Sequence, residues 1–98
     1  MKNPIINLNK VFESRIRLGI MSALMVNDSI DFNSLKELLE VTDGNLASHL
    51  KALEQNEMLM VSKQFVGRKP NTSYAVTQLG REQFKQHLSA LEELLNMQ

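Results

Sequence analysis

The 98-residue chain contains no cysteine and no tryptophan, and it has only two prolines. The absence of cysteine excludes disulfides and thiolate metal sites, and it fits a reducing compartment. No apolar run approaches the roughly 20 residues that a membrane-spanning helix needs, and the N-terminus lacks the apolar core of a signal peptide. We therefore expect residues 1–98 to form a single cytoplasmic domain with no membrane partner.

Groups that could support catalysis or hold a metal are also few. The two histidines, His49 and His87, lie far apart in the sequence, and the segment around His87 offers no second histidine at ligand spacing. The sequence contains no glycine-rich phosphate loop and no nucleophile motif. We expect no metal, no cofactor and no enzymatic activity. His87 is predicted to be a partly exposed residue of an interface.

The overall charge is balanced, with 11 Lys and Arg residues against 11 Asp and Glu residues. A neutral chain at first argues against nucleic acid as a partner. The neutrality is an average over two unlike regions, however. Residues 58–81 hold four basic side chains and no acidic one, which leaves seven basic and 11 acidic side chains, a net charge of −4, for the remainder. The chain is therefore polarised.

Capping residues and apolar spacing divide the first part of the chain into short elements. A short helix is predicted around residues 7–12, and a longer one follows from Ser14, its N-cap, to about Met25. Residues 30–32 alternate in hydrophobicity as a short strand does. These elements would precede the more strongly patterned middle of the chain.

Two helices with almost no connection between them come next. Asn33 is the expected N-cap of the first, over residues 34–40, and Thr42 is that of the second, over residues 43–56. The second helix has leucines at i, i+4 and i+7, which would form its buried stripe. Two short helices joined in this way form a helix-turn-helix. We expect this motif over residues 34–56.

After the second of these helices the apolar period changes from helical to alternating. Two β-prone runs flank a turn cluster at residues 67–71, so residues 58–77 are predicted to form a hairpin with a basic tip. Thr77 then caps a last helix over residues 78–97. A two-stranded hairpin directly after a helix-turn-helix is a wing. The expected fold is therefore α+β, mainly α: a winged helix-turn-helix with a C-terminal dimerisation helix.

These elements are carried by the motifs RLGIMSAL, LKELLEVTDGNLASHLKALEQNEML and GRKPNTSYAVTQLGREQF. In these motifs the chain resembles the winged-helix transcriptional regulators of the MarR/ArsR-like class, and most closely a compact bacterial and archaeal subgroup of about this size. The resemblance extends over residues 12–95. It implies a DNA-binding regulator that reads DNA with the second helix of the motif, and it leaves open a small-molecule effector. One departure is Glu57, where the turn often carries glycine.

The recognition helix would present a small polar face near its N-terminus. At 100° per residue, this face lies opposite or beside the leucine stripe. Asparagine can bind adenine through two hydrogen bonds, serine and histidine can reach base edges or phosphates, and lysine can reach a phosphate. The alternative is an ordinary solvated helix face. The residues expected to contact DNA here are Asn45, Ser48, His49 and Lys51.

The wing would supply the second set of contacts. Lys63, Arg68 and Lys69 could straddle the phosphate backbone or enter a minor groove, and Thr72 and Ser73 could bond phosphate oxygens. The alternative is a turn whose charges only aid solubility.

Two arginines at the start of the first long helix have two possible roles. Arg15 or Arg17 could reach a phosphate, as the resemblance loosely allows. More often such residues pair with local carboxylates, here Glu13 or Asp43. The sequence does not decide between these roles.

The last helix carries an apolar seam with spacings of four, three and four residues. One domain hardly needs a helix so apolar to its end, so a symmetric homodimer is predicted, with help from the N-terminal apolar cluster. The alternative is packing of this helix against the first long helix. The expected interface residues are Ile5, Ile6, Leu8, Phe12, Phe84, Leu88, Leu91, Leu94 and Leu95.

The predicted function is sequence-specific regulation of transcription on double-stranded DNA by a homodimer, most simply as a repressor. The recognition helix would enter the major groove, and the wing would contact the backbone or the minor groove. The rival hypothesis is a winged helix that binds another protein within a larger assembly, since the fold alone does not decide between the two. A basic wing beside a small polar helix face favours DNA.

Overall fold

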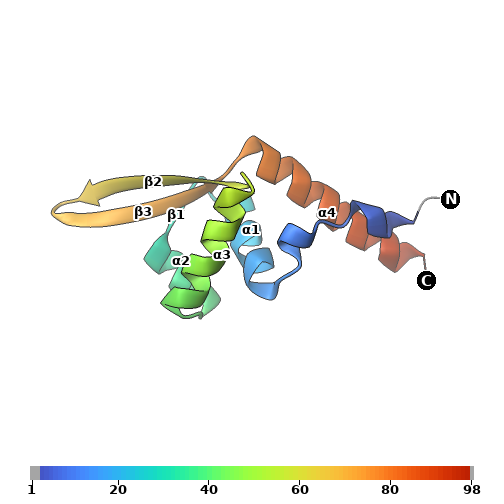
Figure 1. Cartoon of the computed structure of the whole chain (residues 1–98), viewed down its shortest axis with the longest axis horizontal. Coiled ribbons are helices and arrows are strands. Elements are labelled where there is room, and N and C mark those ends of the chain that lie inside the picture. Colours follow the sequence, from blue (N-terminus) through green and yellow to red (C-terminus); the bar gives the residue numbers. More distant parts are fainter. Residues whose placement is uncertain (1–2, 98) are drawn as a thin grey trace.

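The computed structural model describes residues 3–97. The molecule is elongated, measuring 57 × 25 × 21 Å along its principal axes. The hairpin of β2 and β3 extends from one end, and α4 with the N-terminal segment forms the other (Figure 1). The elements in chain order are η1 (Pro4–Asn7), η2 (Lys10–Phe12), α1 (Arg15–Met25), β1 (Ile30–Asp31), α2 (Phe32–Leu39), α3 (Asp43–Gln55), β2 (Leu59–Val66), β3 (Lys69–Val76) and α4 (Gln78–Asn96).

Three helices begin at the N-caps that the sequence predicted. The Ser14 hydroxyl accepts a hydrogen bond from the Arg17 amide at 3.3 Å at the start of α1. The Thr42 and Thr77 hydroxyls accept the corresponding bonds at the starts of α3 and α4, at 3.2 and 2.8 Å. Each bond satisfies an amide that has no partner within its helix.

The second helix begins earlier than predicted, and its N-cap is Asp31 rather than Asn33. Asp31 is the last residue of β1, and its carboxylate accepts hydrogen bonds from the Ser34 amide at 3.3 Å and from the Ser34 hydroxyl at 2.5 Å. The side-chain bond from Ser34 is the main reason that the pKa of Asp31 is lowered. The strand therefore leads into α2 without an intervening loop.

The helix predicted around residues 7–12 is absent, and two 3₁₀ helices, η1 and η2, occupy this segment instead. The break lies at Leu8 and Asn9, whose backbones are extended. The Asn9 side chain accepts a bond from the Val11 amide at 3.0 Å and so caps η2. Asparagine favours such local bonds over a continuous helix.

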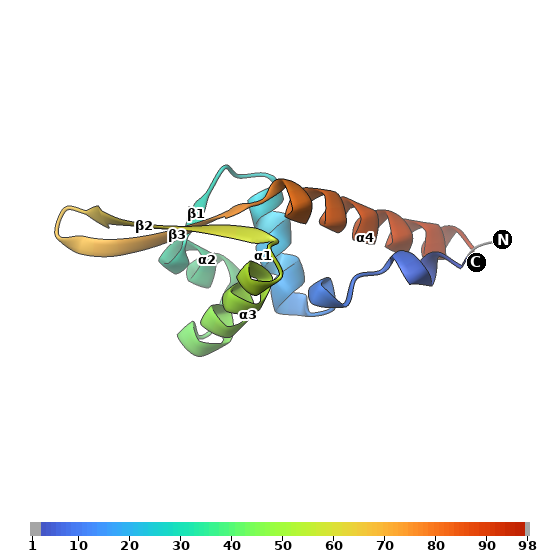
Figure 2. The ribbon, with the colours of Figure 1, turned by 45° about the horizontal axis from the view of Figure 1, so that its top comes forward.

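The hairpin belongs to a three-stranded antiparallel sheet with the order β1–β3–β2. Its turn is tighter than predicted, because β3 begins at Lys69 and only Gly67 and Arg68 lie between the strands. The turn requires a positive φ, which Gly67 supplies at 68°. In both Figure 1 and Figure 2, α2 and α3 lie on one side of the hairpin and α4 runs away from it in the opposite direction.

The core lies where α1, α2, α3 and the base of the sheet meet. The predicted leucine stripe of α3 is buried, as are Ile20, Met21 and Leu24 of α1 and Leu35 of α2, whereas Leu38 of α2 is 60% exposed. Burial of each such side chain contributes about 1.5–3 kcal/mol, so this cluster dominates the stability of the helix-turn-helix. The buried hydrophobic residues that form it are Phe12, Ile20, Met21, Leu24, Leu35, Leu46, Leu50, Leu53, Met58, Leu59 and Phe84.

His87 of α4 fastens the N-terminal segment to the body of the protein. Its Nδ1 accepts a hydrogen bond from the Asn9 amide at 2.9 Å, and its ring lies 5.5 Å from the Phe12 ring and 6.4 Å from the Phe84 ring between centroids. Burial lowers the pKa of His87, against a smaller raising effect of Glu13. His87 is only 3% exposed, so the prediction of a partly exposed interface residue is wrong.

Two aromatic residues assigned above to a dimer interface belong to the core of the single chain. Phe12 and Phe84 are 0% and 1% exposed, and their rings meet edge to face with centroids 5.1 Å apart. The spacing of Phe84 in the apolar seam of α4 fits this inward face as well as an outward one. Their assignment to the surface between two copies is therefore wrong.

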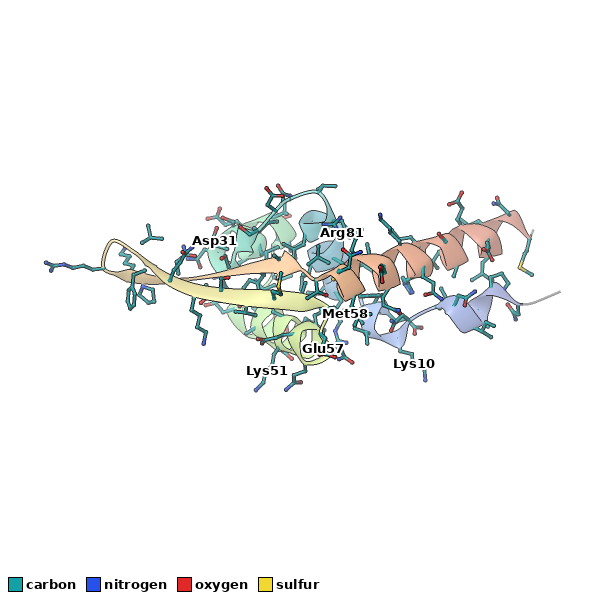
Figure 3. The ribbon with its side chains drawn as sticks, turned by 90° about the horizontal axis from the view of Figure 1, so that it is seen from above. Lys10, Asp31, Lys51, Glu57, Met58 and Arg81 are labelled. Atoms are coloured by element: carbon teal, nitrogen blue, oxygen red, sulfur yellow. The ribbon has the colours of Figure 1, made fainter. Side chains whose placement is uncertain are left out.

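The ends of the wing and the start of α4 meet at one junction (Figure 3). The Thr77 amide donates to the Met58 carbonyl at 3.0 Å, and the Thr77 hydroxyl donates to the Glu57 carbonyl at 2.7 Å. A Cβ on Gly80 would overlap the Met58 carbonyl oxygen, so only glycine allows this approach. Glu57 itself has a φ of 62°, the conformation for which glycine is usual.

Candidate nucleic-acid interface

The connection between α2 and α3 is short, and local contacts hold it at both ends. Glu40 ends α2 in a left-handed conformation with a φ of 53°, and its amide bonds the Lys36 carbonyl. The Lys36 ammonium then pairs with the Asp43 carboxylate at the start of α3, at 2.7 Å. Both side chains are well exposed, so the pair adds little stability. It does offset the one negative charge in the first turn of α3.

The N-terminal half of α3 exposes the side chains that the sequence singled out. Asn45, Ser48 and Lys51 are exposed, and His49 is half-buried. In Figure 3, Lys51 lies on the opposite side of the hairpin from Asp31. Gly44 belongs to the same face, and a Cβ built there meets nothing within 4 Å. The exposed side chains of this face are therefore mostly small and polar, and none of them belongs to the hydrophobic core.

His49 is held by an arginine from another helix. Arg17 of α1 donates from Nε to His49 Nδ1 at 2.9 Å, and it donates from Nη1 to the Val11 carbonyl at 3.2 Å. Arginine is always a donor, so Nδ1 must accept and the neutral ring carries its proton on Nε2. Burial lowers the pKa of His49, and the Arg17 charge lowers it further. His49 thus presents a fixed N–H donor.

The position of Arg17 corrects the choice of partners weighed above. Neither of the two carboxylates considered for it is its partner, because its guanidinium bonds an imidazole and a backbone carbonyl. The Asp43 carboxylate pairs with Lys36 instead. Sequence reasoning missed this contact because the two residues lie 32 positions apart on different helices. No pattern within one helix indicates such a pair.

A groove of about 360 Å³ separates α3 from the inner face of the wing. It brings together three of the predicted contact residues, Lys51 from α3 and Lys63 and Thr72 from the wing. Tyr74 lines the same groove, and its pKa is raised by burial and then by the charge of Glu54. The residues that line the groove are Ala47, Leu50, Lys51, Glu54, Val61, Lys63, Thr72 and Tyr74.

The remaining predicted wing residues are divided between the tip and the other face. Arg68 lies in the turn and Lys69 pairs with Val66 directly beside it, and both cations are exposed. Ser73 faces away from the groove, because successive residues of a strand point to opposite sides. Arg81, the fourth basic residue of the basic segment, lies on α4 and bonds the Met25 carbonyl at 3.3 Å. The wing therefore carries three basic side chains, those of Lys63, Arg68 and Lys69.

Other classes of site find no support in the part of the chain that the structure describes. Across residues 3–97, no three His, Cys, Asp or Glu side chains lie close enough together to hold a metal ion. Over the same residues, no helix has both the length and the apolar character needed to span a bilayer. Every buried side-chain nitrogen or oxygen described has a hydrogen-bond partner.

A helix-turn-helix with an exposed polar face on its second helix, followed by a basic hairpin, defines a winged-helix DNA-binding protein. The chain belongs to the winged helix DNA-binding domain family, whose family model matches residues 16–95. The resemblance to winged-helix regulators is thereby confirmed. The chain is accordingly a DNA-binding regulator of the winged-helix class.

Three known proteins illustrate what the chain is similar to. An uncharacterised protein of Methanocaldococcus jannaschii is 35% identical over 85 residues, which cover 87% of this chain and 92% of that one. A transcriptional regulator homologue from Pyrococcus horikoshii OT3 has a TM-score of 0.86 at 29% identity, with 98% and 96% of the two chains covered. A protein assigned to the MarR family from Enterococcus faecalis V583 shares the fold, with a TM-score of 0.74 at 19% identity and 89% and 77% coverage.

The contact between Arg17 and His49 can be tested by NMR titration. Replacement of Arg17 by Ala removes the positive charge beside the imidazole, so the pKa of His49 should rise towards its ordinary value. His87 on α4 is followed in the same titration, because a change confined to His49 separates loss of the Arg17 charge from a general loosening of the N-terminal segment that His87 holds. The prediction fails if the titration midpoint of His49 is the same in both proteins.

Proposed function

We propose that the protein is a sequence-specific transcriptional regulator that binds double-stranded DNA as a homodimer in the cytoplasm. In this proposal α3 enters the major groove and the wing contacts the adjacent backbone or minor groove. The observation that carries it is the groove in which Lys51 of α3 faces Lys63 and Thr72 of the wing. Cations on both sides of one groove suit a polyanion that touches the helix and the hairpin together.

The outward face of α3 supports base reading as well as phosphate contact. Gly44 and Ser48 are small enough to let the helix approach base edges, and Asn45 can bond adenine through two hydrogen bonds. His49 offers an N–H whose direction Arg17 fixes. Such a donor suits an acceptor, either guanine N7 or O6 or a phosphate oxygen.

A homodimer is proposed from exposed apolar side chains on α4 and η1. These elements lie at the end of the molecule opposite the wing (Figure 1). An apolar surface on α4 and η1 is suited to an isologous contact about a twofold axis. Leu8 and Leu94 are half-buried and lie at its margin. The exposed members are Ile5, Ile6, Leu88, Leu91 and Leu95.

Repression is the proposed mode of regulation, because occlusion of a promoter requires no surface beyond the DNA interface itself. The operator would be an inverted repeat whose half-sites lie about one helical turn apart, about 10 bp, since two α3 helices related by a twofold axis must enter successive major grooves. A protein-binding winged helix is the rival, and it predicts no affinity for duplex DNA even at low salt.

The wing cations can be tested by the salt dependence of binding. Replacement of both Arg68 and Lys69 by Ala should weaken binding to all duplexes, and it should reduce the slope of log affinity against log salt by about 0.9 for each phosphate that the wing no longer neutralises. Fluorescence anisotropy with a random and a selected duplex measures both effects. Lys85→Ala on α4 is the matched control, and its slope should equal that of the wild type.

The same assay separates base reading from backbone contact. Asn45→Ala should cost about 1–3 kcal/mol on the selected duplex and much less on random DNA. Equal losses on the two duplexes would show that Asn45 does not read a base. Absence of binding by the wild type at low salt would instead favour the protein-binding alternative.

Gly44 allows a test in which stability and function change in opposite directions. Gly44→Ala should raise the free energy of unfolding by about 0.5–1 kcal/mol, because alanine favours the helix and its methyl group meets open space. If α3 lies close to base edges, the same methyl group should reduce DNA affinity. Chemical denaturation and anisotropy measure the two quantities. Unchanged affinity for the selected duplex contradicts the proposed approach of α3.

The dimer can be tested by analytical ultracentrifugation. The wild type should sediment at twice the chain mass of 11.2 kDa, and Leu91→Glu should shift it towards the monomer by placing a charge in the apolar surface. Val26→Glu is the control, because Val26 is 81% exposed and lies on the loop after α1. A monomeric wild type at all concentrations that support DNA binding contradicts the homodimer.

A further inference from the structure

The wing carries an exposed aromatic side chain that belongs neither to the proposed DNA contacts nor to the proposed dimer interface. Phe65 is 74% exposed near the tip of β2, and its neighbour Val66 is 62% exposed. Burial of a large apolar side chain against a partner is favourable, because it removes apolar surface from water. A partner that covers Phe65 would therefore account for its presence there.

No other segment among residues 3–97 covers the Phe65 side chain. Figure 1 shows the outer part of the hairpin extending beyond the helices. The third strand, β1, pairs only with Ser73 and Tyr74 of β3, far from the tip. The apolar surface proposed for the dimer lies on α4 and η1 at the opposite end of the molecule, so dimerisation through it leaves Phe65 exposed.

The register of the hairpin assigns Phe65 to the face that borders α3. Lys63 and Thr72 pair with each other and line the groove beside α3. Phe65 follows Lys63 by two positions, so it lies on the same face, and it pairs with Pro70 on β3. Val66 lies on the opposite face. Pro70 has a fixed φ and gives the aromatic ring a stiff neighbour.

The charges around Phe65 indicate the class of partner. Lys63 lies on the same face as Phe65, Arg68 lies in the turn, and Lys69 pairs with Val66 on the opposite face. No acidic residue occurs in the sequence between Glu57 and Glu82. A cationic hairpin requires a polyanion, and duplex DNA on the exposed face of α3 would pass this face of the wing. Proteins that bind the minor groove often combine such cations with an apolar wedge that enters a base step.

We propose that Phe65 is an apolar wedge that enters the minor groove of duplex DNA next to the major groove occupied by α3. The inference rests on the proposed function and adds a residue to it. The cations hold the wing on the backbone, while the Phe65 ring contacts sugars and partly unstacks one base step. The wedge bends the duplex, and it favours flexible pyrimidine–purine steps at a fixed distance from each half-site.

The proposal predicts a loss of affinity that salt does not influence. Phe65→Ala should weaken binding to the selected duplex about 5- to 30-fold, and the salt slope should stay that of the wild type, because an apolar contact releases no counterions. Val66→Ala is the matched control: the residue is equally near the tip, exposed and apolar, but on the other face, and its affinity should stay within about twofold. Thermal melts of both variants check that folding is unchanged.

DNA shape supplies a second readout. Energy transfer between dyes at the ends of a duplex of about 30 bp should report a bend with the wild type and a smaller bend with Phe65→Ala. Replacement of the flexible step under the wing by a stiff A-tract should weaken the wild type. It should leave the affinity of Phe65→Ala nearly unchanged, since that variant has no wedge to insert.

The outcomes separate this proposal from the function on which it rests. If the wild type does not bind duplex DNA at low salt, the proposed function fails and the wedge fails with it. If the wild type binds but Phe65→Ala binds and bends DNA equally well, only the wedge is overturned. Loss of binding to phosphatidylserine vesicles in Phe65→Ala, with duplex binding intact, would also overturn it and assign the residue to a membrane surface.

Discussion

The Thr77 hydroxyl makes two hydrogen bonds that join the end of the turn after α3 to the first turn of α4. It donates to the Glu57 carbonyl, and it accepts from the Gly80 amide. The two ends of the wing are thereby joined at its base. Because the Met58 carbonyl lies against Gly80, any side chain at this position would force α4 away from the base of the wing. The turn after α3, the base of the wing and the first turn of α4 are therefore joined at one junction.

Local chemistry made much of this arrangement predictable from the sequence. Ser14, Thr42 and Thr77 cap helices because the residue type and the apolar spacing that follows agree. Contacts between elements were not predictable. Phe12 is apolar at a position that suits a core or an interface equally well, and only the packing of η2 against α4 decides for the core. Asp31 and Asn33 are both good caps, and the end of β1 selects the first.

The candidate site shows the same limit. A helical projection predicts which residues of α3 point outward, and Asn45, Ser48 and Lys51 do. It says nothing of what a neighbouring helix contributes, so the Arg17 contact that orients His49 was missed. Arg17 also bonds the Val11 carbonyl of η2, a segment that His87 of α4 holds through Asn9. A continuous series of hydrogen bonds and ring contacts thus joins the N-terminal segment to α3.

The short first strand also has a mechanical consequence for the wing. β1 supports β3 only at Ser73 and Tyr74, so towards the turn the hairpin continues as two strands that pair only with each other. Two-stranded ribbons twist more strongly than larger sheets, and alone they are only marginally stable, so a change in their twist costs little free energy. The outer part of the wing is therefore more flexible than its base, where β1 adds a third strand. This flexibility lets the wing fit grooves of different width, although ordering it on a partner costs conformational entropy.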